Sequence, residues 1–402
     1  MVKQIKKLPV ADLEFQMFVL DELADELLAQ GKDVIKLTIG ISELEIPEKV
    51  RQVFSDTIFD FKKTHRVFPQ GIPELRQALA DYYNNQFHVN TQFDNIIVNV
   101  GTSSIFRNLF QILCQSGQEI LLPKPYYCLY LLSAILAGAK ISYYDIDYQT
   151  RKIDFDSFKK NYDPDKTAVV VLNNPGNPLG NIITQEEITE INKIIDGRSY
   201  IVNDEIYNNT LFYDEYKSPL SYLDDKYRDV NIITNAFSKG FRMYTKRVGY
   251  AILPDSLIMP MRIVQQHTLL THDPVNQYGA IAALQDLEAP KELTRIYKER
   301  AEYSYTSLKG TGCDPIKSEG GFYIVLDGDR WVKEKGMESS KDLAIDIAKK
   351  VHVATVPGTD FGIPNGLRLS FCNDRYKEGI DRLRDYFTRK LGLKPRPSRA
   401  TF

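Results

Sequence analysis

Short runs of apolar residues recur through the middle of the chain, and longer segments with a helical period of apolar and polar residues separate them. The helical segments include 185–195, and the apolar runs lie at 95–100, 119–122, 139–144, 168–172, 200–202, 230–233 and around 252. Apolar runs of this length are typical of buried strands. Their alternation with helices from about 95 to 255 predicts a mostly parallel sheet covered by helices on both faces.

The two ends of the chain show a different order of elements. Before the sheet region, the pattern predicts a strand at 34–39 and helices at 15–30, 47–61 and from 71 onward. From about 290, a long charged helix leads into a smaller α+β part, with strands at 321–326 and 367–371 and a helix near 340–350. A last helix follows, and the tail after Leu393 is expected to be frayed.

Charge and hydropathy exclude several classes of protein. The 402 residues include 51 basic and 53 acidic side chains, so the formal net charge is -2 and no basic stripe indicates a nucleic-acid partner. No apolar run approaches the roughly 18 residues of a membrane helix. The first residues form no apolar signal core, and we therefore expect a cytoplasmic protein without a membrane partner.

Cysteine and histidine spacing gives no sign of a metal or of disulfides. Cys114, Cys128, Cys313 and Cys372 are far apart and form no Cys-x-x-Cys pair, so reduced core thiols are expected. The five histidines show no metal-ligand spacing, and we expect no metal.

A lysine directly follows one of the apolar runs. Run 230–233 leads through a short turn to Ser238 and Lys239, and Arg247 precedes the next apolar run. Such junctions lie at the sheet edge where α/β proteins bind ligands. A lysine there can form a Schiff base with a carbonyl, and an arginine can hold a phosphate by two parallel hydrogen bonds. Taken alone, the pair is equally compatible with a surface lysine and a structural arginine.

Four further stretches also follow apolar runs: 101–104, 125–127, 173–180 and 203–207. The first offers N–H groups and hydroxyls at a helix start to an anion such as phosphate. The second offers a tyrosine ring for stacking, the third a loop shaped by two Asn-Pro steps, and the fourth the carboxylate of Asp204. Each has an ordinary structural explanation as well, such as a helix cap or core packing.

These five stretches share one position, the carboxyl ends of the predicted strands. Their coincidence predicts a single ligand site that contains a phosphate loop, an aromatic ring, a polar loop, a carboxylate, a lysine and an arginine.

The same stretches resemble those of fold-type I pyridoxal-phosphate enzymes, and in particular the class I/II aminotransferases of the aspartate aminotransferase superfamily. Asn-Pro-Gly-Asn-Pro-Leu-Gly at 174–180 is similar to the family motif Asn-Pro-x-Asn-Pro-Thr-Gly. Phe-Ser-Lys at 237–239, followed by Arg-Val-Gly-Tyr at 247–250, resembles the Schiff-base segment. Gly-Ile-Pro-Glu-Leu-Arg at 71–76, Pro-Gly-Thr-Asp-Phe-Gly at 357–362 and Leu-Arg-Leu-Ser-Phe at 367–371 fit further signatures. The resemblance covers roughly residues 32–382.

This resemblance implies the α/β architecture of PLP fold type I, a mostly parallel seven-stranded sheet flanked by helices. A large cofactor-binding domain would comprise residues 47–290, and both chain ends, 1–46 plus 291–402, would form a smaller α+β domain. The resemblance also implies a homodimer with shared active sites, in which the smaller domain closes over the substrate.

The resemblance also implies pyridoxal 5'-phosphate as the cofactor and a role for each matching residue. Lys239 would form the internal aldimine and then move the proton of the substrate Cα. Asp204 would pair with the protonated pyridine nitrogen. The 3-hydroxyl oxygen would be hydrogen-bonded by Asn177 and Tyr207, and the ring would stack on Tyr127. The phosphate would be surrounded by Gly101, Thr102, Ser103, Ser238 and Arg247.

For the substrate, the resemblance implies that Arg368 binds the α-carboxylate as a bidentate fork, near the backbone of Gly40. Arg66 stands where many relatives have a tyrosine that reaches the partner subunit's phosphate, so it would face either phosphate or substrate. Further departures from the family pattern are Leu179, Ala236, the loop Gly-Ile-Ser-Glu-Leu at 40–44 and the segment 267–274. These departures leave the roles of Arg66, Glu43 and His272 open, together with the identity of the substrate.

Three functional hypotheses follow. The first is an aminotransferase that moves an amino group between an L-amino acid and a 2-oxo acid. The second is a PLP enzyme of the same fold that catalyses cyclisation, elimination or oxidation of an amino acid, such as an arginine derivative of specialised metabolism. The third, a cofactor-free binding protein, is disfavoured because Lys239, Asp204 and Arg247 are all present.

Overall fold

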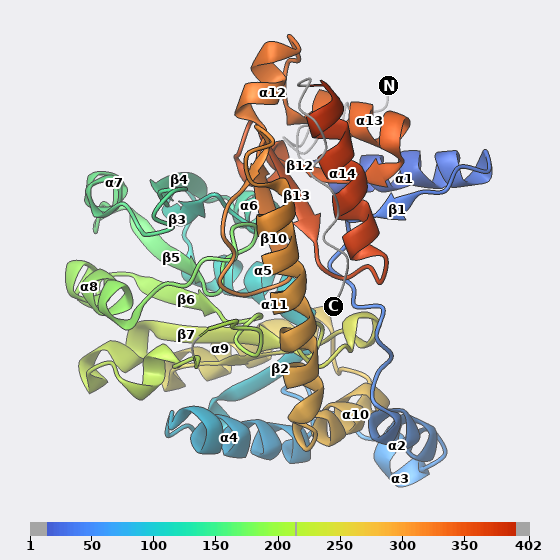
Figure 1. The fold of residues 1–402 in the computed structure, drawn as a ribbon. Coiled ribbons are helices and arrows are strands. Elements are labelled where there is room, and N and C mark those ends of the chain that lie inside the picture. Colours follow the sequence, from blue (N-terminus) through green and yellow to red (C-terminus); the bar gives the residue numbers. More distant parts are fainter. Residues whose placement is uncertain (1–13, 214, 391–402) are drawn as a thin grey trace, which may run out of the picture. The chain divides into compact units, whose positions relative to one another are not determined.

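A computed structural model describes residues 14–213 and 215–390 of the chain. It divides into two compact units, each described below on its own (Figure 1). The larger unit contains residues 44–296 and 319–321, and the smaller unit contains the described residues up to 43, 297–318 and those from 322 onward. The tail after Leu393, which was expected to be frayed, lies outside the described residues.

The larger unit is built on a seven-stranded sheet, which confirms the predicted fold class. Its strands, in spatial order, are β2 (Ile96–Val100), β8 (Val248–Ile252), β7 (Asn231–Ala236), β6 (Tyr200–Asp204), β5 (Thr167–Asn173), β3 (Glu119–Lys124) and β4 (Lys140–Asp145). Both pairings of β8 are antiparallel, and the other pairings are parallel. The carboxyl ends of the six parallel strands and the amino end of β8 therefore meet at one edge of the sheet.

Both faces of this sheet are buried. In β2, Ile96 and Val98 belong to one apolar cluster, whereas Ile97 belongs to another cluster on the opposite face. A strand that is buried on both faces reads as a continuous apolar run, which explains why the runs were visible in the sequence. The helices of this unit are α2 (Glu48–Ile58), α3 (Phe61–Thr64), α4 (Pro73–Phe87), α5 (Gly101–Leu113), α6 (Leu129–Leu136), α7 (Phe155–Asn161), α8 (Gln185–Ile195), α9 (Asp255–Thr268) and α10 (Pro274–Leu284).

Local chemistry sets several of these helix boundaries. Helix α8 begins with a capping box, in which the Thr184 hydroxyl accepts from the Glu187 N–H and the Glu187 carboxylate accepts from the Thr184 N–H. The predicted helix 47–61 is wrong at its end, because α2 stops at Ile58 and the Asp60 carboxylate caps a separate short helix, α3. The sequence pattern gave no prediction for α7, α9 or α10.

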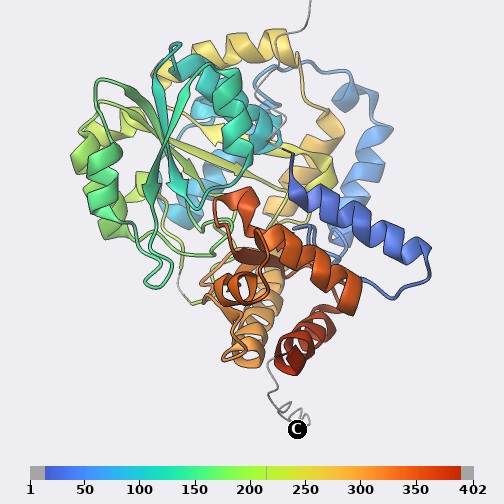
Figure 2. The same ribbon diagram turned by 90° about the horizontal axis from the view of Figure 1, so that it is seen from above.

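The smaller unit combines segments from both ends of the described chain. A four-stranded antiparallel sheet has the order β12 (Val356–Pro357), β13 (Gly366–Ser370), β10 (Tyr323–Asp327) and β9 (Asp314–Pro315). Strand β1 (Ile35–Lys36) pairs in parallel with β11 (Val353–Ala354). Helix α1 (Gln16–Ala29) packs beside α13 (Ser340–Val351), although the two are far apart in sequence (Figure 2). The remaining helices are α12 (Asp329–Glu334), α14 (Tyr376–Lys390) and the second half of α11 (Glu288–Leu308), which begins in the larger unit.

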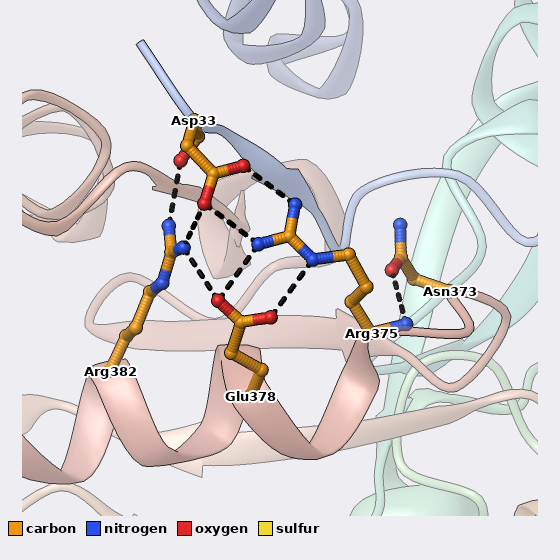
Figure 3. A network of polar contacts seen from close by, with 5 residues as sticks. All are labelled: Asp33, Asn373, Arg375, Glu378 and Arg382. Atoms are coloured by element: carbon orange, nitrogen blue, oxygen red, sulfur yellow. Dashed lines mark hydrogen bonds and ion pairs between the residues drawn. The ribbon is translucent and has the colours of Figure 1, made fainter.

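A network of charged side chains joins the segment before β1 to helix α14 (Figure 3). The Asp33 carboxylate accepts hydrogen bonds of 2.7 and 2.8 Å from the Arg375 guanidinium, and it also pairs with Arg382. Glu378 accepts from both arginines. Hydrogen bonds from the two arginines hold the pKa of the Asp33 carboxyl well below its usual range. Because the network is exposed to solvent, its main effect is to fix where the two segments meet rather than to add much stability.

Over residues 14–213 and 215–390, no helix is long and apolar enough to cross a membrane. The same residues contain no cluster of three or more His, Cys, Asp or Glu side chains placed to hold a metal ion. The four cysteines are free and buried, as the sequence predicted.

Candidate active site

Asp204 and Lys239 lie at the same edge of the larger unit's sheet. Asp204 is the last residue of β6, and it stands opposite Thr234 of the neighbouring parallel strand β7. Lys239 follows the end of β7 by three residues. Because the two strands are adjacent and run in the same direction, their carboxyl ends bring the carboxylate and the amine to the same edge of the sheet.

The Asp204 carboxylate is buried, with a side chain that is 3 % exposed. The Tyr130 hydroxyl donates to Oδ2 at 2.6 Å, and the Ile206 N–H donates to Oδ1 at 3.3 Å. Burial raises the pKa of Asp204 to about 6. A buried carboxylate of this kind is stabilised in its charged form by an adjacent cation, such as a protonated ring nitrogen.

Tyr127, the predicted stacking residue, lies between β3 and α6. Its ring packs edge-on against Tyr130, with centroids 5.7 Å apart and planes at 86°. Tyr130 therefore contacts both Tyr127 and Asp204, although the sequence analysis did not select it. Tyr130 comes three residues after Tyr127, and this spacing brings two side chains to the same side of a helical turn. That spacing is the sequence signal that would have identified Tyr130.

The loop 173–180 is attached to the end of β6. The Asn173 amide and the Asn174 N–H both donate to the Asp204 carbonyl, at 3.2 and 3.0 Å. The Asn177 N–H donates to Asn173 Oδ1 at 2.7 Å. Asn177 is thus placed beside Asp204 by Asn173, a residue that was not predicted to matter. Tyr207, three residues beyond Asp204, is also buried.

Gly101 and Arg247 form a tight corner at the start of α5. Gly101 has φ +73, a left-handed conformation that suits glycine, and a Cβ there would lie 2.5 Å from Arg247 Nη2. Arg247 Nη2 also donates to Ser103 Oγ at 3.4 Å. Within the described chain, no side chain caps the first turn of α5, so its N–H groups can bind an anion. Thr102 belongs to the same turn and is buried.

Lys239 and Arg247 face a common aromatic ring. Lys239 Nζ lies 5.2 Å from the centroid of Tyr244, and the Arg247 guanidinium carbon lies 5.7 Å from the same centroid. The Lys239 side chain is only 9 % exposed, and Ser238 beside it is 6 % exposed. The structure therefore brings the amine and the guanidinium to the same ring, with Ser238 next to the lysine in the chain. Tyr244 was not predicted, because its position depends on the turn between Lys239 and β8.

Two predicted substrate residues, Gly40 and Arg368, lie in the smaller unit. Arg368 on β13 has its guanidinium carbon over the rings of Tyr323 and Phe361, at 4.0 and 4.5 Å from their centroids. Its Nη2 donates to the Thr38 carbonyl at 2.8 Å. A Cβ on Gly40 would overlap the Tyr323 hydroxyl, so the close approach requires glycine. The structure thus joins Gly40 and Arg368 through Tyr323.

Arg66 lies in the larger unit and has partners of its own. Its guanidinium pairs with Glu74, donates to the Tyr278 hydroxyl at 2.8 Å and stacks 4.7 Å above Phe68. Among the described residues, the structure therefore brings Arg66 together with an acid and a tyrosine, and not with the corner of Gly101 and Arg247. Glu43, whose role was left open, accepts from the Asp374 N–H in the smaller unit, and burial raises its pKa.

Residues 32–387 match the model of the family described as aminotransferase class I and II. The chain belongs to this family. It is 29 % identical to an aspartate aminotransferase of Bacillus sp. strain YM-2, over 90 % of this chain and 93 % of that protein. It is also 29 % identical to a (5-formylfuran-3-yl)methyl phosphate transaminase of Methanocaldococcus jannaschii, over 94 % of this chain and 98 % of that protein.

Solved structures agree with this assignment. A single mutant of the Thermus thermophilus aspartate aminotransferase has a TM-score of 0.86 at 26 % identity and covers 96 % of this chain and 99 % of its own. Class I and II aminotransferases use pyridoxal phosphate to transfer amino groups, and this is the activity and the cofactor of the chain. The relatives described here carry aminotransferase or transaminase names, and none favours the cyclase or lyase alternative.

The residues at the sheet edge fit pyridoxal phosphate. The uncapped start of α5, the Ser103 hydroxyl and the Arg247 guanidinium are the donors that a phosphate dianion requires. Gly101 leaves the space in which a side chain would displace that guanidinium. The buried Asp204 carboxylate fits a ring nitrogen that carries a proton, and the buried Lys239 amine fits an aldehyde.

A second buried carboxylate, Glu205, follows Asp204 and was not predicted. It is 0 % exposed and accepts hydrogen bonds from the Tyr83 hydroxyl at 3.2 Å and the Ser218 hydroxyl at 2.8 Å. Burial raises its pKa from 4.5 to about 7. The charged form is therefore costly in the folded protein, and it is present above about pH 7.

Replacing Glu205 with glutamine is expected to stabilise the protein at pH 8 and to have little effect at pH 5. The pKa of Glu205 is higher in the folded than in the unfolded protein, so the ionised carboxylate lowers the free energy of unfolding at pH 8, where it is charged in both states. As the pH falls through 7 towards 4.5, the carboxyl is protonated in the folded protein and this destabilisation disappears. A shift from 4.5 to about 7 corresponds to at most roughly 3 kcal/mol at pH 8. Urea unfolding of both proteins at the two pH values measures the difference, and a difference that does not change with pH would contradict the expectation.

Proposed function

We propose that the edge formed by β6, β7 and the start of α5 is the catalytic centre for amino transfer, with Lys239 as the catalytic base. The observation that carries this proposal is the register of β6 and β7, which brings Asp204 and Lys239 to one edge. Bound pyridoxal phosphate supplies an electron sink for the electron pair left on the substrate Cα when its proton is removed.

The residues around the cofactor site have separate tasks in this proposal. Lys239 Nζ takes the proton from the substrate Cα and returns it on the cofactor side, and its burial keeps water away from the amine. Asp204 would keep the ring nitrogen protonated, and the Tyr130 hydroxyl orients the carboxylate through Oδ2. Asn177 and Tyr207 would hydrogen-bond the ring oxygen, and Tyr127 would cover the ring. The phosphate would be held by Gly101, Thr102, Ser103, Ser238 and Arg247.

We expect the substrate α-carboxylate to bind to Arg368, with Gly40 beside it. The rings of Tyr323 and Phe361 fix the plane of the guanidinium, which is the geometry that a bidentate carboxylate needs. Replacing Arg368 with alanine should raise the KM for the amino acid roughly 100-fold, because a buried charged partner is lost. Replacement with lysine should restore only part of this, since lysine has no planar fork.

Steady-state kinetics and cofactor titration of the Arg368 variants separate the two possible outcomes. The affinity for pyridoxal phosphate should stay within twofold of the wild-type value. A loss of cofactor affinity as large as the change in KM would contradict a role in carboxylate binding.

We propose an acidic amino acid such as aspartate as the first amino donor to test, since the relative from Bacillus sp. strain YM-2 is named an aspartate aminotransferase. The test follows the absorbance of the cofactor after each of the twenty amino acids is added alone. A transaminase converts the cofactor to its amine form once and then stops until a 2-oxo acid is added. Continued turnover without a 2-oxo acid would instead indicate elimination or cyclisation.

We also propose that the protein is a homodimer. Exposed apolar side chains lie where α2 meets α3 and just after α3 in the larger unit, with Ile58, Phe59, Phe61 and Val67 between 59 % and 86 % exposed. Such clusters are typical of protein interfaces. Sedimentation velocity should give twice the mass of one chain, and replacing Phe59 with aspartate should weaken the association. A monomer at the concentrations used for activity would contradict the proposal.

Two further proposals concern the domains and the cellular compartment. We propose that residues 47–290 act as the cofactor-binding domain and that 1–46 plus 291–402 act as the small domain. The free, buried cysteines support a reducing compartment such as the cytoplasm.

A further inference from the structure

The loop between α9 and α10 buries a histidine against the backbone of Arg247. His272 is 3 % exposed, and its Nε2 lies 2.8 Å from the Arg247 carbonyl oxygen. The other ring nitrogen, Nδ1, lies 3.1 Å from the Asp273 carbonyl oxygen, so each ring nitrogen faces an oxygen that can only accept a hydrogen bond. We assign the donor role to Nε2, because its contact is the shorter of the two.

The backbone that His272 contacts is in an unusual conformation. Arg247 has φ 55, in the left-handed region, where residues with a side chain are strained. This conformation ends the short helix Tyr244–Lys246 and directs the chain into β8. From this backbone the side chain extends to place Nη2 against Ser103 and in the space beside Gly101. Strained backbone persists where neighbouring groups hold it, and the hydrogen bond from His272 is such a restraint.

His272 is itself held in place by buried partners. The Gln277 side chain, which is fully buried on α10, donates to the His272 carbonyl at 2.9 Å. Gln277 Oε1 accepts from the Ile72 N–H at 2.8 Å. On the other side of His272, the Asp273 carboxylate caps α10 through the Val275 N–H. The backbone that carries the imidazole is therefore tied through Gln277 to α10 and to the N–H of Ile72.

We propose that His272 is a positioning residue for phosphate binding, which sets the Arg247 guanidinium by holding the Arg247 carbonyl. The ligand class is a phosphomonoester dianion, and the proposal rests on the proposed function in one respect, that Arg247 holds the cofactor phosphate. His272 does not touch the phosphate in this scheme. It acts only through Arg247, so its effect should depend on both the phosphate and the guanidinium.

Titration of the apoenzyme with pyridoxal phosphate and with pyridoxal, which lacks the phosphate, tests this dependence. Replacing His272 with leucine removes the donor at similar size, and it should weaken pyridoxal phosphate binding about tenfold, the loss expected for one hydrogen bond. Binding of pyridoxal should stay within twofold. Replacing His272 with glutamine, which keeps a donor, should recover most of the lost affinity. His267→Leu, on the exposed face of α9, is the matched control and should change neither affinity.

A double-mutant cycle with Arg247→Ala completes the experiment. In the Arg247→Ala background, His272→Leu should cause no further loss of pyridoxal phosphate affinity. Thermal unfolding of each apoenzyme shows whether it is folded, and His272→Asn, with a shorter reach, replaces the leucine variant if that variant unfolds.

Two results would overturn the proposal. Equal weakening of pyridoxal and pyridoxal phosphate would show that His272 supports the loop in general, and so would a loss that persists without the Arg247 guanidinium. Failure of the proposed function gives a different result, in which Arg247→Ala alone leaves pyridoxal phosphate affinity unchanged; the role of His272 would then be refuted together with it.

Discussion

Replacing Lys239 with alanine is expected to reduce amino transfer by at least about 10⁴-fold, because in the proposed mechanism one side chain supplies both the covalent bond to the cofactor and the proton transfer at the substrate Cα. Pyridoxal phosphate should still bind, through the phosphate donors at the start of α5 and through Asp204. The measurement is the rate of transamination in the presence of both substrates. Borohydride treatment followed by mass spectrometry should attach the cofactor covalently to the wild-type chain and not to the variant.

The matched control for this prediction is Lys226→Ala, which removes an exposed lysine elsewhere in the larger unit. This variant should keep wild-type activity. Added methylamine should restore a small part of the activity of Lys239→Ala, because a free amine can move the proton without being attached to the chain. Turnover of Lys239→Ala at the wild-type rate would refute the catalytic role of the lysine.

The second large effect is expected at Asp204, where replacement with asparagine should lower the rate about 10³-fold while the cofactor remains bound. Asparagine has the same shape, but it carries no charge to keep the ring nitrogen protonated. Because burial raises the pKa of Asp204 only to about 6, the carboxylate is charged at pH 8 even before the cation is bound. The loss should therefore be seen at pH 8 in single-turnover measurements with a saturating amino acid.

A variant with a smaller expected effect tests the same role of the Asp204 carboxylate. Tyr130→Phe removes the hydroxyl that donates to Asp204 Oδ2 at 2.6 Å and leaves the ring against Tyr127. It should lower the rate in the same direction, by about tenfold, which is the cost of one hydrogen bond. A wild-type rate for Asp204→Asn would show that the ring nitrogen needs no charged partner in this enzyme.

The sheet could be predicted from the sequence because strands such as β5 are buried on both faces and are therefore continuously apolar. The end of α2 could not be predicted from its period alone, since the Asp60 cap that starts α3 competes with continuation of the helix. The direction of β8 also has no signal in hydrophobic periodicity. The antiparallel pairing with β2 and β7 became visible only in the structure.

The residues of the candidate site also fall into two groups, those that the sequence predicted and those that only the structure revealed. Lys239, Asp204 and Gly101 were predicted because each follows an apolar run or the short turn after it, so that local sequence gives its place. Tyr130 and Glu205 were not, because the partners that hold them are distant in the chain: Asp204 for Tyr130 and Tyr83 for Glu205. Tyr244 was not, because its place depends on the turn between Lys239 and β8. His272 was noticed as an irregularity of the segment 267–274, but only its contact with the Arg247 carbonyl shows what it touches.

The reversal of β8 has a consequence for how this enzyme can be altered. Because the chain leaves β7 and returns as β8 at the same edge, the Lys239 amine and the Arg247 guanidinium, which we propose bind opposite ends of the coenzyme, belong to one continuous hairpin connection, 239–247. Cutting or lengthening the backbone at 240–246 would change the distance between these two side chains. A circular permutation with new termini elsewhere on the surface would leave that distance unchanged.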